Sequence, residues 1–202
     1  MKALLVLPLI LLGLGFSATP APEPAAAPEG IEHYTVDGGH SSIVFKVQHF
    51  GLSNFYGRFN EVSGKIVVDP DDPTANEVEV EINAASIDTN SKGRDDHLKS
   101  ADFFDVEQFP VILFHSTKVR PKGKDAMQLK GYLELHGVRK EIEAQLHHIG
   151  SGQDSRGRYR AGYEARFKIK RTDFGMGYGA DKGVLGDEVE VIVALEATRD
   201  SE

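Results

Sequence analysis

The sequence predicts an all-β protein, an eight-stranded antiparallel barrel with one short helix near residues 91–104. Hydrophobic residues recur at every second position through most of the chain beyond residue 30, as in "EVEVEINA" at residues 77–84. This period is typical of a strand with one face in the core and one in water. Such strands belong to antiparallel sheets, and closing eight of them into a barrel removes the exposed edges. A two-sheet sandwich is the alternative architecture.

The alternating segments follow one another closely along the chain. The first, "HSSIVFKVQHF", places Ile43, Phe45, Val47 and His49 on one face of a strand. Eight strands are predicted, at residues 40–50, 62–69, 77–84, 111–119, 127–135, 142–148, 159–169 and 189–197. Segments rich in Gly, Pro, Asp and Asn predict turns at residues 69–76, 121–125, 136–140 and 150–158.

One segment breaks the alternation and predicts the helix. In "NSKGRDDHLKSADFFD", Asn90 or Ser91 is suited to capping the helix start, and Leu98 and Phe104 fall on one face. The adjacent pair Phe103 and Phe104 is suited to closing one end of the barrel. This is a packing role before it is a functional one.

The N-terminus predicts export. Met1 and Lys2 precede the apolar run "ALLVLPLILLGLGF", which has the length of a signal-peptide core rather than of a membrane span. We expect a signal peptide at residues 1–18, a Pro/Ala-rich linker at residues 19–30 and one folded domain at residues 31–202. Retention of the apolar run as an uncleaved anchor is the alternative. After cleavage, no stable membrane insertion is expected.

Composition excludes several classes of function. The chain has 31 acidic and 23 basic residues, a formal net charge of -8, which is the wrong sign for a nucleic-acid-binding protein. The absence of cysteine excludes disulfides, thiolate catalysis and cysteine-bound metal centres.

The histidines do not form a metal-binding motif. Eight are present, but neither H-x-H on a strand nor H-E-x-x-H on a helix occurs, and His147 and His148 point to opposite faces of their strand. His49 and His115 could still meet across the fold. A rival hypothesis is an enzyme that acts on an apolar substrate inside the same barrel and uses His49 or His115 as acid–base groups. The serines Ser41 and Ser42 lack a nucleophile elbow and indicate the start of a strand. The sequence thus predicts neither a metal nor a cofactor.

The segment "RTDFGMGYGADKGVLGD" at residues 171–187 does not match a phosphate-binding glycine motif. We interpret it as a long loop beside a barrel mouth that is able to move for ligand entry. Arg171 is expected to pair with Asp173 or with the helix.

The inward-facing rows form a broad apolar lining. This lining belongs either to a packed core or to a tunnel for a long apolar chain. Both produce the same period of two in the sequence, so periodicity does not distinguish them. Burial contributes about 0.8 kcal/mol per methylene, so a chain of roughly ten carbons could offset an association cost of about 4–15 kcal/mol. His49 lies toward a polar end of this lining, where an imidazole can hydrogen-bond a ligand head group or a protein partner. The predicted ligand-binding residues are Phe45, Val47, His49, Val80, Ile82, Phe103, Phe104, Ile112, Phe114, Leu133, Phe167, Ile169 and Val191.

Four stretches of the chain resemble the YceI-like, polyisoprenoid-binding proteins of bacteria. They are "VDGGHSSIVFKVQHFGLSNFYGRF", "INAASIDTNSKGRDDHLKSADFFDVEQFPVILFHST", "LKGYLELHGVRKEI" and "RAGYEARFKIKRTDFG", in the order of that family. The resemblance implies a lipocalin-like barrel exported to the periplasm, which binds a long-chain isoprenoid or similar fatty amphiphile in its interior. It implies no known enzymatic reaction, and it implies pairing of two barrels as a homodimer. A stress-related interaction protein with a filled core is a further rival.

Overall fold

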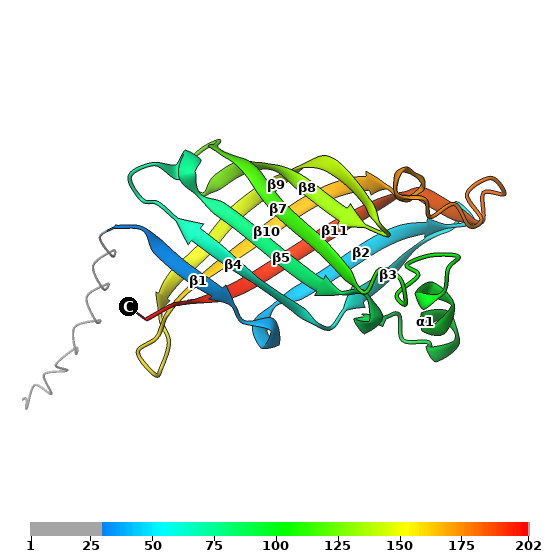
Figure 1. Ribbon diagram of the computed structural model, residues 1–202, viewed down its shortest axis with the longest axis horizontal. Helices are drawn as coiled ribbons and strands as arrows, with labels where there is room; N and C mark the ends of the chain where they lie inside the picture. The colour runs from blue at the N-terminus through cyan, green and yellow to red at the C-terminus, as the bar shows by residue number, and fades with distance from the viewer. Residues whose placement is uncertain (1–29, 202) are drawn as a thin grey trace, which may run out of the picture.

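The computed structural model describes residues 30–201, so the predicted signal peptide and nearly all of the linker lie outside the described residues. The described chain is an elongated antiparallel barrel with one helix at one end (Figure 1). Among residues 30–201, no helix is long and apolar enough to span a membrane. The elements are β1 (Glu32–Val36), β2 (Ser42–His49), β3 (Ser53–Phe59), β4 (Val62–Val68), β5 (Glu77–Asn83), β6 (Ile87–Asp88), α1 (Lys92–Lys99), β7 (Val111–Pro121), β8 (Ala126–Leu135), β9 (Val138–Gln153), β10 (Tyr159–Lys170) and β11 (Leu185–Arg199), with short 3₁₀ turns at Gly38–His40, Pro73–Ala75, Ala84–Ser86 and Arg171–Phe174.

Eight strands close the ring in the order β1-β4-β5-β7-β8-β9-β10-β11, and β11 returns to β1. The long strand β11 has two partners along one edge, because its C-terminal part pairs with β1 and its N-terminal part with β2. β3 then pairs with β2, and the two-residue strand β6, which follows β5, pairs with β3. These strands therefore extend the barrel wall beyond β1, at the end that carries α1 (Figure 1).

The predicted fold class is confirmed, and all eight predicted segments are strands. Three strands were not predicted: β1 and β6 are too short for a clear alternation, and glycine interrupts the inward row of β3 at Gly57. The helix is shorter than the predicted 91–104, since α1 ends at Lys99 and turns follow. Ser91 takes the N-cap position, but its side chain makes no capping bond; its carbonyl accepts from Arg94 and Asp95 instead.

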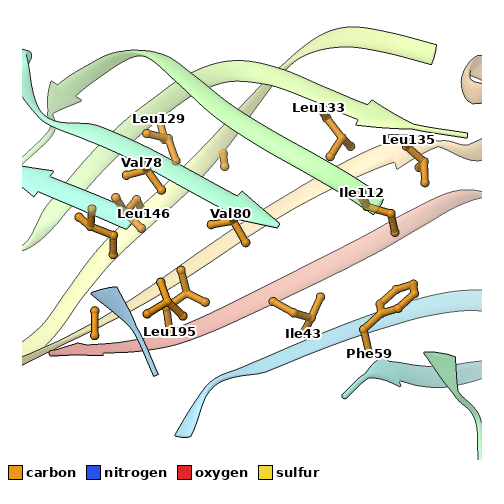
Figure 2. Packing of buried hydrophobic residues seen from close by; sticks show 14 of the residues in the cluster. Ile43, Phe59, Val78, Val80, Ile112, Leu129, Leu133, Leu135, Leu146 and Leu195 are labelled. Carbon is orange, nitrogen blue, oxygen red and sulfur yellow. The ribbon is translucent and has the colours of Figure 1, made fainter. Parts of the chain in front are cut away.

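The core lies on the inner wall of the barrel. Val78 and Val80 on β5 point inward from one wall, and Ile43 on β2 and Leu195 on β11 point inward from the facing wall (Figure 2). The predicted β8–β9 turn is a tight hairpin at His136 and Gly137, whose φ angles of 53° and 70° match a turn with two left-handed residues. Short connections of this kind hold the wall strands in register.

Candidate functional site

A cavity of about 350 Å³ occupies the barrel interior. This volume falls in the range of about 300–1,000 Å³ that is usual for small-molecule sites. Its wall consists almost wholly of aliphatic and aromatic side chains from β2, β3, β5 and β7 to β11. The interior is therefore hollow enough for an alkyl chain.

All thirteen residues that the sequence predicted to bind a ligand lie on this wall; that they bind one stays a prediction. Most come from the inward rows of the strands, and Phe103 and Phe104 come from the turns after α1. They are Phe45, Val47, His49, Val80, Ile82, Phe103, Phe104, Ile112, Phe114, Leu133, Phe167, Ile169 and Val191.

Glycines on neighbouring strands leave room for two of the phenylalanine rings. A Cβ added at Gly57 on β3 would lie 2.7 and 3.0 Å from Cε1 and Cε2 of Phe45, and closer still to Cζ. A Cβ at Gly131 on β8 would lie 2.6 Å from Cζ of Phe114. Both rings therefore lie against the barrel wall rather than across the lumen. Phe45, Phe114 and Phe167 form no ring pairs with one another within residues 30–201.

The cavity opens at the end that carries α1. Only three of its lining residues are exposed: His49 at the end of β2, Arg94 on α1 and Tyr178 in the loop before β11. At the opposite end the lining is buried, for example at Leu129 and Leu146. In Figure 1 α1, the end of β2 and the loop before β11 gather at one end of the barrel. Polar groups of a bound molecule would thus meet water at this mouth.

Aromatic and cationic side chains form the rim of the mouth. The Arg94 guanidinium lies 4.3 Å from the centre of the Phe55 ring, and its Nε donates to Thr89 Oγ1 at 2.8 Å. The His97 ring contacts Phe103 and Tyr178 edge-on, and its Nε2 lies 2.8 Å from Asp102. These contacts fix α1 against the barrel and place one permanent positive charge beside the opening.

Arg171 organises the loop between β10 and β11. It is only 3% exposed, and its guanidinium donates to the carbonyl oxygens of Met176, Leu185 and Gly186 at 2.7 to 2.9 Å. Burial lowers the pKa of this guanidinium, opposed by the nearby charge of Asp187. The expected pairing of Arg171 with Asp173 or with the helix is wrong: three backbone carbonyls satisfy it.

Asp173 instead lies 3.8 Å from Lys140 on β9. Through Arg171 the loop folds back over the mouth, and Met176, Tyr178, Val184 and Leu185 line the cavity.

Two tyrosines, one buried and one partly buried, lie toward the closed end. Tyr163 lines the cavity, and burial raises its pKa to about 12, so its phenol is neutral. Within residues 30–201 the Tyr163 hydroxyl has no hydrogen-bond partner, and it is not fully buried, because no fully buried side-chain oxygen there lacks a partner. Tyr34 is 2% exposed and donates to Glu32; burial first, and then this bond, raises the pKa of Tyr34.

The structure does not bring His49 and His115 together. His49 lines the mouth, whereas His115 lies on the outer face of β7, where its Nδ1 is 3.6 Å from Glu79. Ser41 lies at the start of β2, and its hydroxyl donates to the carbonyl of Asp37.

Within residues 30–201, one group of side chains has metal-ligand spacing: Asp37, His40 and Glu196. Arg160 already supplies a cation there, since its Nη1 binds the carboxylates of Asp37 and Glu196. This group therefore reads as an ion-pair network.

Sequence reasoning missed the lining residues outside the regular rows. Met176, Tyr178 and Val184 come from an irregular loop, and Gly57 and Gly131 act through the partner strand. The hydrophobic residues among the glycines of the loop were the available signal for Met176, Tyr178 and Val184. Gly57 and Gly131 carry no sequence signal unless the strand register is known.

Comparison with known proteins agrees with this architecture. The model of the family described as YceI-like domain matches residues 34–197. A UPF0312 protein of Pseudomonas aeruginosa (strain LESB58) is 39% identical over 188 residues, which cover 93% of this chain and 95% of that protein. A UPF0312 protein of Serratia proteamaculans (strain 568) is 42% identical over 168 residues, 82% of this chain and 86% of that protein.

Solved structures share the barrel. Burkholderia cenocepacia BcnA superposes with a TM-score of 0.73 at 23% identity, covering 80% of this chain and 98% of BcnA. Campylobacter jejuni YCEI protein gives 0.68 at 29% identity, with 77% and 90% covered. A polyisoprenoid binding domain from Saccharophagus degradans gives 0.64 at 21% identity, with 83% and 98% covered.

Proposed function

The chain belongs to the YceI-like family, and from this premise and its cavity we propose that it binds a long-chain isoprenoid or similar amphiphilic lipid inside the barrel. The observation that carries the proposal is the apolar cavity of about 350 Å³, whose exposed lining residues among residues 30–201 lie at the α1 end. The description of the Saccharophagus degradans domain as polyisoprenoid binding supports the ligand class, although at 21% identity that likeness concerns the fold.

The wall explains how such a ligand would be held. Each methylene that leaves water contributes about 0.8 kcal/mol, so hydrophobic burial provides most of the affinity. The thirteen predicted residues are the proposed contacts for the chain. His49, at the exposed mouth, is the proposed hydrogen-bonding partner of the head group. An apolar wall distinguishes chains only weakly, since one methylene changes binding by about 1–3 kcal/mol.

We also propose a cellular role as a carrier. The predicted signal peptide would place the barrel in the periplasm, where a polyprenyl chain needs a cover to cross water. The chain is proposed to sequester or transport the lipid without changing it chemically. A homodimer stays a prediction of the family resemblance, and sedimentation velocity tests it.

The test is uptake of a short isoprenoid, farnesyl phosphate, by delipidated protein, with mass spectrometry of the extracted organic phase before and after incubation. Stoichiometric uptake of unaltered ligand is expected. Absence of both endogenous lipid and uptake would refute the binding proposal, and a chemically altered ligand would indicate an enzyme.

A cavity-filling variant tests whether the ligand binds inside the barrel. Ala165 on β10 lines the cavity, and Ala165→Phe is expected to abolish uptake by occupying the lumen. The matched control is Ala194→Phe on β11, because Ala194 pairs with Glu164 and is not part of the wall. Equal uptake by the two variants would place the ligand outside the barrel.

A further inference from the structure

The β2–β3 hairpin ends in an apolar tip beside the cavity mouth. Phe50 and Gly51 are the two central residues of the turn, and Leu52 N donates to His49 O at 3.0 Å. Leu52 is 88% exposed and Phe50 is 54% exposed. Neither belongs to the cavity wall or to the core.

Phe50 is an unfavourable residue for its backbone position. Four non-glycine residues within residues 30–201 have positive φ, and three of them are Asn90, Asp105 and His136, the types that tolerate this region. The fourth is Phe50, at φ 51°, followed by Gly51 at 67°. Asn-Gly is the favoured pair for such a turn. Phenylalanine in this backbone conformation lowers local stability, and more than half of the residue is exposed to solvent. We therefore infer that Phe50 serves a role other than folding.

The tip lacks charge. No Asp, Glu, Lys or Arg occurs between Lys46 and Arg58, in a chain that is 27% charged overall. Burying a charge is costly, so an uncharged tip is suited to enter an apolar medium. The exposed apolar area is on the order of 300 Å², well below the roughly 800 Å² per partner of a standard protein interface. It is adequate for a transient, shallow contact with a bilayer.

The tip is continuous with the mouth. Phe50 N donates to Val184 O at 2.9 Å, and Val184 lines the cavity. The Phe50 ring also contacts the ring of His49, with 4.5 Å between ring centres, and His49 lines the mouth. Contact of the tip with a membrane would bring the opening against the lipid, so an apolar chain could enter without crossing water.

We propose that Phe50 and Leu52 dock the barrel on a phospholipid bilayer, mouth first, for collisional exchange of its ligand. The ligand part of this proposal rests on the proposed function, whereas the docking part stands on the tip alone. The test variant is Phe50→Asn/Leu52→Ser, because Asn-Gly preserves the turn and its melting temperature should equal or exceed that of the wild type. The control is Ile31→Ser/Ile149→Ser.

Ile31 and Ile149 are exposed to a similar extent as the two tip residues, at 61% and 69%, but they lie elsewhere on the molecule. They lie at the start of β1 and near the β9–β10 connection, at the end of the barrel opposite α1 (Figure 1).

Two measurements with phosphatidylcholine vesicles test docking. In flotation, wild type and control should rise with the vesicles and the tip variant should not. In stopped-flow transfer of a fluorescent farnesyl phosphate from vesicles, the wild-type rate should increase with vesicle concentration. The tip variant should be about tenfold slower or more, with a rate independent of vesicle concentration.

The outcomes separate the two proposals. Wild type that floats but never binds the probe, even from vesicle-free solution, overturns the proposed function and leaves docking supported. Tip and control variants that float and transfer alike overturn docking, whatever the ligand. A tip variant that only lowers the sedimentation coefficient also overturns docking, because it would place the tip between two copies of the chain.

Discussion

Replacing Gly57 by alanine is expected to push the Phe45 ring into the cavity and to weaken lipid binding. The added Cβ would lie 2.7 Å from Cε1 of Phe45 and closer to Cζ, and only side-chain atoms of that ring are this near. To reach ordinary contact, the ring has to shift by about 1.5 Å toward the lumen. Gly131 is less suitable for the experiment, because a Cβ there would also strike the backbone carbonyl of His115.

The expected magnitude follows from the lumen that is lost. The shifted ring and the new methyl group take the room of roughly two or three ligand methylenes, which corresponds to about 2 kcal/mol. Affinity for farnesyl phosphate should therefore fall about 30-fold, measured by isothermal titration calorimetry. Crowding of the wall should lower the free energy of unfolding by about 1–3 kcal/mol.

A second substitution tests the cause. Phe45→Leu in the Gly57→Ala background should recover most of the affinity, and the double-mutant cycle should show the coupling. Gly123→Ala, where nothing lies within 4 Å, is the control. Unchanged affinity of Gly57→Ala, or a loss that Phe45→Leu does not reduce, would refute the reasoning that the glycine keeps the lumen open.

Three further predictions concern polar side chains. Arg171→Met leaves three backbone carbonyls without their hydrogen-bond donor and should lower the free energy of unfolding, measured in urea, by about 3–5 kcal/mol. An unchanged free energy of unfolding would contradict the role of Arg171 in the loop. Hydrogen bonds from Arg160 and then His40 lower the pKa of Asp37 to about 2, so its stabilisation is present above pH about 4 and is lost as pH falls toward 2. Arg160→Gln should flatten this part of the curve of unfolding free energy against pH. Tyr163→Phe should tighten farnesyl phosphate binding about fivefold or more in calorimetry, because the chain strips water from a hydroxyl without a partner; weaker binding would indicate a polar group at the deep end of the ligand.

Strand rows and wall residues could be predicted because both follow from the period of two. Once Phe45 is inward, Val47 and His49 are inward as well, and the eleven wall positions that lie on strands need no knowledge of strand order. Phe103 and Phe104 follow instead from the expectation that this pair closes one end of the barrel. The hollow lumen could not be predicted in the same way. It depends on Gly57 facing Phe45 across β2 and β3, which is a matter of register. Glycine in a strand also weakens the alternation, so β3 itself escaped prediction.

Arg171 illustrates a second limit. An arginine in a glycine-rich loop suggests a charged partner such as Asp173, but its partners are backbone carbonyls, which every residue possesses. No side-chain pattern reveals them. The sequence therefore predicts a mobile loop. In the structure the buried guanidinium of Arg171 holds this loop over the mouth by hydrogen bonds.

The wall and the mouth have different physical tasks, and their sequences differ accordingly. The wall is regular, apolar and held by strand pairing, and under the proposed function it would give affinity for many chains but little discrimination. Discrimination between head groups must therefore come from the mouth, where Arg94 provides a fixed charge and His49 and His97 provide imidazoles. Three segments surround the mouth: α1, which carries Arg94 and His97; the β2–β3 hairpin, with His49 at the end of β2; and the loop before β11, which carries Tyr178. A change of lipid specificity within this fold should accordingly need substitutions in these three segments and none in the barrel wall.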